Sequence, residues 1–266
     1  MKLFSFRNLR ILVLLGLLAT VAIYSKSQLL YSTAWLEPLA VIIFPINADG
    51  KPGTGRYIDG LSDRDFADID AFMAREGHKY KILERSPTRT RLGPPVKAAP
   101  PEAPDPRSSS ILARIIWSLK LRYWAWKNTP DDESNRNRVR MFVLYYQGDD
   151  GQPLSHSLGL QKGLLGIVHA YAIKAQNRQN NLVIAHELLH TVGATDKYDS
   201  NNQPTYPEGY AAPARSPRYP QTRAEIMSGR IPSSPTESVM AKSLRSCVIG
   251  RATAREINWI GTDDSL

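Results

Sequence analysis

The chain has 266 residues, of which 42% are hydrophobic and 22% are charged, a balance typical of folded proteins and not of disordered ones. The formal net charge is +9, but Lys and Arg are scattered along the chain, so no nucleic-acid partner is expected. The single cysteine, Cys247, excludes an intramolecular disulfide and a cysteine-based zinc cluster, and its apolar neighbours predict a buried position.

The N-terminus carries positive charge followed by an apolar run. Lys2, Arg7 and Arg10 precede residues 11–24, which contain no charged side chain. This pattern is typical of a targeting segment, and the basic end is expected to stay in the cytoplasm. Residues 1–30 are therefore interpreted as a membrane anchor or signal segment. We expect a single-pass protein of the cell membrane whose C-terminal domain lies outside the cytoplasm, periplasmic or extracellular; the alternative is secretion after signal cleavage.

The first half of the remaining chain predicts strands, a helix and a linker. Residues 39–46 (LAVIIFPI) are apolar and β-branched, which favours a buried strand. A helix is expected to begin at Ser62 or Asp63 and to end at Gly77, and residues 80–83 are a second, short strand candidate. Residues 86–107 contain seven prolines, which excludes a helix or a central strand and indicates an extended linker or surface excursion.

The second half alternates helices and strands. A helix capped by Ser109 or Ser110 is expected near residues 111–126, and its apolar residues are interpreted as packing on the core, with contact to a membrane surface as the alternative. A further helix is expected to begin at a cap on Asn180 or Asn181 and to continue through His186 and His190. The other expected segments are strands at 139–146, 154–160 and 164–171, an irregular stretch at 199–221, an apolar patch around 240–249 and a helix near 253–259.

The segment that carries chemistry is LVIAHELLHTVGATDKYD, residues 182–199. His186 and His190 are four residues apart, so on a helix both rings project from one face and can bind one ion, and neutral imidazole is a preferred zinc ligand. Glu187 is placed to reach an activated water without binding the metal. Gly193 ends the helix and permits a turn that would bring Asp196 back as third ligand.

Three protein ligands leave a fourth position on the ion for water, which is the catalytic and not the structural arrangement of zinc. The expected cofactor is therefore Zn²⁺, held by His186, His190 and Asp196. In this interpretation Glu187 accepts a proton from the attacking water and then delivers one to the leaving amine.

The motif HELLHTVGATD resembles the metzincin clan of zinc peptidases, in the HExxHxxGxxD form of its snapalysin-like branch. The resemblance implies an α+β, zincin-like fold: a mixed, twisted sheet with the active-site helix beneath it and an irregular C-terminal subdomain. It implies one peptidase domain over residues 36–266, with the proline-rich insertion at about 86–107. It also implies a methionine turn beneath the metal, for which Met227 in AEIMSGRIP is the candidate. Several clan members have a tyrosine two residues after that methionine; this chain has Gly229 there, and Tyr198 is the candidate substitute.

The function expected from these residues is a zinc-dependent endopeptidase that acts outside the cytoplasm. Its partners would be a peptide or protein substrate, lying along an edge strand such as residues 154–160, and the membrane through the N-terminal segment. One alternative interpretation is also an enzyme: it keeps the two histidines as ligands but takes Glu208 or Glu225 as the third ligand. Another is a membrane-anchored binding or scaffold protein whose metal site is structural or inactive.

Overall fold

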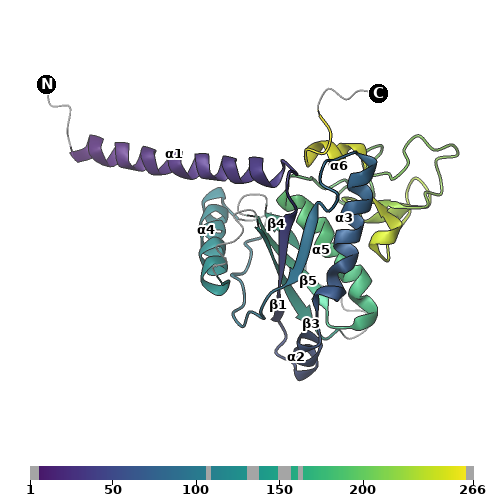
Figure 1. The fold of residues 1–266 in the computed structure, drawn as a ribbon, viewed down its shortest axis with the longest axis horizontal. Helices are drawn as coiled ribbons and strands as arrows, with labels where there is room; N and C mark the ends of the chain where they lie inside the picture. The colour runs from purple at the N-terminus through teal and green to yellow at the C-terminus, as the bar shows by residue number, and fades with distance from the viewer. Residues whose placement is uncertain (1–5, 106–108, 131–137, 149–156, 161–163, 262–266) are drawn as a thin grey trace.

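The structure is a computed structural model that describes residues 6–105, 109–130, 138–148, 157–160 and 164–261. It is a mixed α+β fold with a mostly parallel, five-stranded sheet and several helices (Figure 1). The sheet strands are β1 (Leu39–Asn47), β2 (Thr88–Leu92), β3 (Arg138–Tyr146), β4 (Leu158–Leu160) and β5 (Leu165–Tyr171). The helices are α1 (Phe6–Ser32), α2 (Pro52–Asp59), α3 (Ala67–Lys79), α4 (Ile111–Asn128), α5 (Asn177–Thr191) and α6 (Arg251–Glu256).

The strand order is β2-β1-β3-β5-β4, which places β2 and β4 at the two edges of the sheet. Strands β2, β1, β3 and β5 pair in parallel, and β4 pairs with β5 in the antiparallel direction. The central strands β1, β3 and β5 carry continuous apolar runs because both faces of a parallel sheet are covered. The strands predicted at residues 39–46, 139–146 and 164–171 are thereby confirmed.

Alternate residues of the central strands feed two separate cores. On β3, Met141, Val143 and Tyr145 belong to the larger core, which includes apolar residues of α3 and α5. Phe142 and Leu144 face the opposite way and pack with α4. This alternation is the period-two geometry of a strand. The sheet is therefore sandwiched between α3 and α5 on one face and α4 on the other (Figure 1).

The structure contradicts the prediction of a membrane anchor. Helix α1 has 27 residues and extends away from the rest of the molecule (Figure 1). Within the described part of the chain, no helix has both the length and the apolar character that a membrane crossing requires. The uncharged run at residues 11–24 is shorter than the roughly 20 apolar residues of a spanning helix. The prediction of a single-pass protein of the cell membrane is therefore wrong. Secretion after signal cleavage stays a prediction.

Several element boundaries also differ from the expectation. Residues 80–83 form a turn region, and the second strand is β2, inside the segment predicted as a linker. This segment tolerates a strand because β2 is short and lies at the sheet edge, between the prolines. Of the strand predicted at residues 154–160, residues 154–156 lie outside the described residues, and β4 covers the last three. The proline-rich stretch beyond β2 contains no described helix or strand, as predicted.

The C-terminal part, after α5, consists mostly of turns and short paired segments. Two small sheets occur there: β6 (Ala224–Glu225) pairs with β9 (Cys247–Val248), and β7 (Arg230–Pro232) pairs with β8 (Ser238–Met240). The irregular stretch predicted at residues 199–221 contains no described helix or sheet strand beyond isolated bridges. Helix α6 begins at Arg251, close to the expected position, and Cys247 is fully buried as predicted.

Candidate metal centre

Helix α5 positions the motif against the sheet. It begins at Asn177, three residues before the predicted cap, because Asn180 and Asn181 are used inside the helix. The Asn180 side chain bonds the backbone of Tyr171 on β5, and the Asn181 amide donates to the carbonyl of Asp65. These two asparagines therefore fasten the first turns of α5 to its neighbours, which a sequence pattern could not distinguish from capping.

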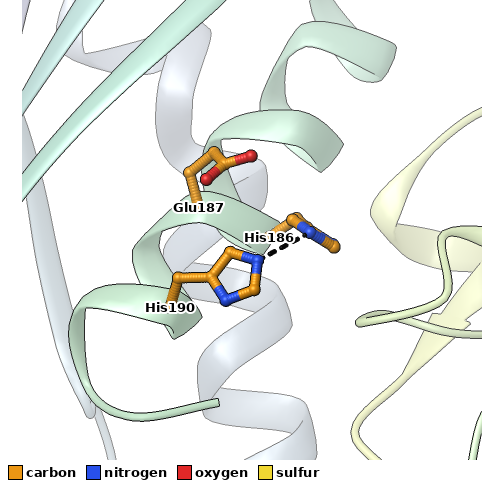
Figure 2. Close-up of side chains that lie close together, drawn as sticks. All are labelled: His186, Glu187 and His190. Atoms are coloured by element: carbon orange, nitrogen blue, oxygen red, sulfur yellow. Dashed lines mark hydrogen bonds between the residues drawn. The ribbon is translucent and has the colours of Figure 1, made fainter. Parts of the chain in front are cut away.

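The structure brings His186, Glu187 and His190 together on α5 (Figure 2). One potential ligand atom from each residue lies within 4.8 Å of the others, so the group could hold a metal ion and is compatible with an HExxH motif. The Nε2 atoms of the two imidazoles are 3.1 Å apart. This proximity follows from the four-residue spacing, which places both rings on the same helical face.

Asp196 lies against both histidines. Helix α5 ends at Thr191, and Gly193 has a φ of 115°, a left-handed conformation that favours glycine. The chain turns back there, and Asp196 Oδ1 lies 3.1 Å from His186 Nε2 and 3.0 Å from His190 Nε2. Nε2, Nε2 and Oδ1 thus form a nearly equilateral triangle. Atoms about 3 Å apart can all bond one cation at the 2.0–2.1 Å typical of zinc.

The hydrogen-bonding of the rings decides what this triangle can bind. His186 Nδ1 lies 3.0 Å from the carbonyl oxygen of Ile226, and His190 Nδ1 lies 2.8 Å from that of Ala194. Each Nδ1 must donate a hydrogen to its carbonyl, so in the neutral rings Nε2 carries a lone pair. Two lone pairs and a carboxylate oxygen then face one another, which is unfavourable unless a positive charge lies between them. The donor set fits a divalent cation that accepts nitrogen and oxygen ligands.

The directions in which the pKa values of His190 and Asp196 are shifted also indicate that this site favours positive charge. Burial lowers the pKa of His190, but hydrogen bonds to Asp196 and Ala194 outweigh burial and raise it above its ordinary value. Burial raises the pKa of Asp196, but the two imidazoles outweigh burial and lower that pKa far below its ordinary value. The carboxylate is therefore ionised at neutral pH and available as a ligand.

Glu187 lies beside this triangle, with a carboxylate oxygen within 4.8 Å of a ring nitrogen of each histidine, and it is almost completely buried. It is 6% exposed, and its Oε2 has no hydrogen-bond partner among the described residues. Burial is the largest influence on its pKa, which is raised above the ordinary glutamate value. A buried carboxylate oxygen without a partner is costly and calls for an explanation, such as a water or substrate that it serves. Glu187 has the features of a group that exchanges a proton.

Glu225 organises the turn that supports His186. Its carboxylate is fully buried and accepts hydrogen bonds from the backbone of Met227 and Gly250 and from the hydroxyl of Thr253. The neighbouring Ile226 carbonyl accepts from His186. Met227 is itself buried in the larger core, and its carbonyl accepts from the backbone N–H of Lys197, next to Asp196. The turn at Met227 therefore contacts the His186 side chain on one side of the site and the backbone next to Asp196 on the other.

The cluster of described residues that could hold a metal ion consists of His186, Glu187 and His190, so it contains neither rival carboxylate and not Asp196 either; the choice among the three rests on their contacts. Both carboxylate oxygens of Glu225 are occupied by the hydrogen bonds of the 225–229 turn and α6. Glu208 is exposed on the irregular C-terminal stretch. Asp196 is the carboxylate that touches both imidazoles.

A cavity of about 410 Å³ opens beside His186. Its lining includes His186, Glu187, Tyr198 and Arg230, contributed by α5, the segment after it and β7. The Tyr198 ring lies 6.5 Å from the His186 ring, centroid to centroid, at an interplanar angle of 22°. Burial, the Asp196 charge and a side-chain hydrogen bond to Asp196 raise the pKa of Tyr198 to about 12, so the hydroxyl keeps its proton and can donate it in a hydrogen bond.

Glu256 is a supporting residue that the sequence pattern did not indicate. It lies on α6, 60 residues after Asp196 in the numbering, and bonds the backbone N–H and the hydroxyl of Thr195 at 2.9 and 2.7 Å. Its carboxylate also accepts from Lys197 Nζ at 2.7 and 2.8 Å, and the Lys197 side chain is 7% exposed. Glu256 therefore anchors both neighbours of Asp196. No local spacing could reveal a partner so distant along the chain.

We expect Glu256→Gln to lower the free energy of unfolding by about 1–3 kcal/mol at pH 7, because a buried lysine loses its charged partner. Burial raises the pKa of Glu256, but hydrogen bonds from Lys197 and Thr195 outweigh burial and lower it below 4.5. A lowered folded-state pKa stabilises the protein above the unfolded-state pKa, and this contribution is lost as the pH falls through the folded-state value. The stabilities of wild type and variant in urea unfolding should therefore converge as the pH falls below the ordinary pKa of glutamate. Glu237→Gln, at an exposed position, is the matched control. An equal stability of Glu256→Gln and wild type at pH 7 would contradict the anchoring role.

Comparison of the chain with models of known protein families and with the sequences of curated proteins finds no match in either case.

Proposed function

We propose that the protein is a zinc-dependent peptidase of metzincin type, with His186, His190 and Asp196 as metal ligands and Glu187 as the general base. The observation that carries the proposal is the convergence of three acceptor atoms within 3.1 Å, next to the buried Glu187 Oε2, which has no hydrogen-bond partner within the described part of the chain. The first feature fits a cation and the second fits proton transfer. Together they favour a catalytic centre over a structural one, in which no adjacent base is needed.

In this proposal the ion, when bound, supplies the Lewis acidity that activates water and stabilises negative charge on the substrate carbonyl. Glu187 Oε2 accepts the proton that the attacking water loses and later donates it to the nitrogen of the leaving amine. The raised pKa of Glu187 brings its protonated and ionised forms closer in free energy, which suits a group that must alternate between them. Tyr198 lines the same cavity, and its hydroxyl can exchange its hydrogen bond to Asp196 for one to the carbonyl oxygen of a substrate.

The edge strand β4 is the proposed support for an extended substrate. It lies at the end of the sheet, and its Gly159 packs directly on α5: a Cβ at that position would lie 2.5 Å from the Glu187 carbonyl oxygen. The missing side chain thus lets the strand approach the catalytic turn of α5 closely. A peptide that pairs with the free edge of β4 would pass next to Glu187 and His190. Residues 36–266 would be the peptidase domain.

The direct test is metal-dependent proteolysis by the full chain. We expect the purified protein to cleave an unfolded substrate such as casein, to lose this activity after treatment with a zinc chelator, and to regain it with one equivalent of Zn²⁺ but not Mg²⁺. Loss and recovery follow because the ligand set of two imidazoles and one carboxylate prefers zinc over harder ions. Stoichiometric zinc binding without proteolysis of any unfolded substrate would favour a structural metal site and contradict the proposal.

A further inference from the structure

Helix α4 presents an apolar stripe to solvent. Six of its large apolar or aromatic side chains are more than half exposed: Ile111, Leu112, Ile115, Leu119, Tyr123 and Trp126. At about 100° per residue they fall within an arc of about 120° on one side of the helix, an arc that also contains the partly buried Arg122. Exposed apolar side chains are common singly, but a continuous stripe of this kind indicates a contact surface.

The stripe is not needed to hold α4 on the protein. The opposite side of the helix carries the fully buried Leu121 and Ala125, which belong to the smaller core. Trp124 packs edge-on against Phe142 of β3 with ring centroids 4.6 Å apart, and the Trp117 indole N–H donates to the Pro101 carbonyl. The helix is thus fixed to the sheet by one face (Figure 1), and the stripe residues on its other face are exposed.

The charges of α4 indicate the kind of partner. Its 18 residues include Arg114, Lys120, Arg122 and Lys127 but no Asp or Glu. Lys120 and Lys127 are exposed and border the stripe on one side, by the same 100° spacing. An apolar face bordered by cations, with Tyr and Trp among its residues, is the composition of helices that lie in the interface of a bilayer. A second copy of the chain would instead bring the two lysines of one stripe close to those of the other, which is electrostatically unfavourable.

We propose that α4 docks on an anionic lipid surface, lying parallel to it with the stripe in contact with the acyl region and the lysines at the phosphates. This is a peripheral contact through a helix of the folded domain, and it does not depend on the metal centre or on α1. Electrostatic attraction makes such binding sensitive to salt and to the content of acidic lipid, because each lysine near the surface adds to the affinity.

The test is co-sedimentation of the full chain with vesicles of phosphatidylcholine, with and without phosphatidylserine. We expect binding to the acidic vesicles that weakens with salt, and a loss of about tenfold or more in affinity for Leu119→Ser/Trp126→Ser. Lys120→Glu/Lys127→Glu should abolish the preference for acidic vesicles. Leu36→Ser/Leu83→Ser replaces two leucines outside α4 that are more exposed than Leu119 and Trp126, and it is the matched control, expected to bind like wild type. Circular dichroism of each variant verifies that it is folded.

Two results would overturn the proposal. The first is equal vesicle affinity of wild type and both α4 variants, which would assign any lipid binding to another part of the chain, such as α1. The second is a wild-type dimer in sedimentation velocity that Leu119→Ser/Trp126→Ser dissociates, without vesicle binding by either protein, which would assign the stripe to a second copy. Quenching of tryptophan fluorescence by brominated lipids shows whether α4 itself contacts the lipid. We expect stronger quenching of the wild type than of Trp126→Phe.

Discussion

Glu187→Gln is expected to lower kcat/KM for peptide hydrolysis by about 10²–10⁴, the usual contribution of a general acid–base group, while the zinc content stays at wild-type level. Glutamine keeps the shape of the side chain but cannot accept and return a proton. Because Glu187 lies outside the triangle of His186, His190 and Asp196, its replacement leaves all three proposed ligands in place. Activity and metal binding should therefore separate in this variant.

The measurement pairs peptidase kinetics with metal analysis by mass spectrometry of the same samples. Glu208→Gln, an exposed glutamate proposed as a rival ligand, is the matched control and should change neither quantity. Wild-type activity in Glu187→Gln would remove the general-base assignment. Simultaneous loss of activity and zinc would instead indicate that Glu187 itself binds the metal.

The second large effect is expected from Asp196→Ala, which should weaken zinc binding by more than about a hundredfold. Replacing a residue that only supports a metal ligand typically weakens metal affinity by 10–100-fold, and replacing a direct ligand should weaken it more. Without the carboxylate, two neutral imidazoles remain 3.1 Å apart with no negative charge to offset the ion. Activity should fall with the metal, in contrast to Glu187→Gln.

Competition titration with a zinc-binding dye gives the affinity of wild type and Asp196→Ala. Asp196→Asn distinguishes charge from shape, since the amide oxygen can occupy the same place without the negative charge, and it should bind zinc with intermediate affinity. Glu208→Ala should bind like wild type. Unchanged affinity in Asp196→Ala would reopen the choice of third ligand.

The sequence predicted best those features that depend on local pattern. The β-branched runs at residues 39–46 and 139–146 form central strands because continuous apolar runs suit a sheet covered on both faces. The spacing of His186 and His190 placed both on one helical face for the same local reason. Gly193 was expected to turn the chain, and its positive φ is consistent with that role.

Features fixed by distant partners were missed or misplaced. Asn180 and Asn181 look like helix caps, but they bond β5 and the segment before α3, so α5 begins earlier. Glu256 lies far along the chain from Thr195. The proline-rich segment contains an edge strand because β2 completes its pairing with β1 alone. The anchor was predicted from basic residues followed by an uncharged run, and that run is shorter than a helix needs to cross a bilayer.

Zinc K-edge X-ray absorption of the full chain, loaded with one equivalent of Zn²⁺, tests the metal centre most directly. The expected spectrum has two imidazole nitrogens and two oxygens at about 2.0–2.1 Å, one oxygen from Asp196 and one from solvent, and the Asp196→Ala spectrum loses one of these oxygens or the metal altogether. A wild-type spectrum without two imidazole ligands, or a chain that takes up no stoichiometric zinc, would contradict the account.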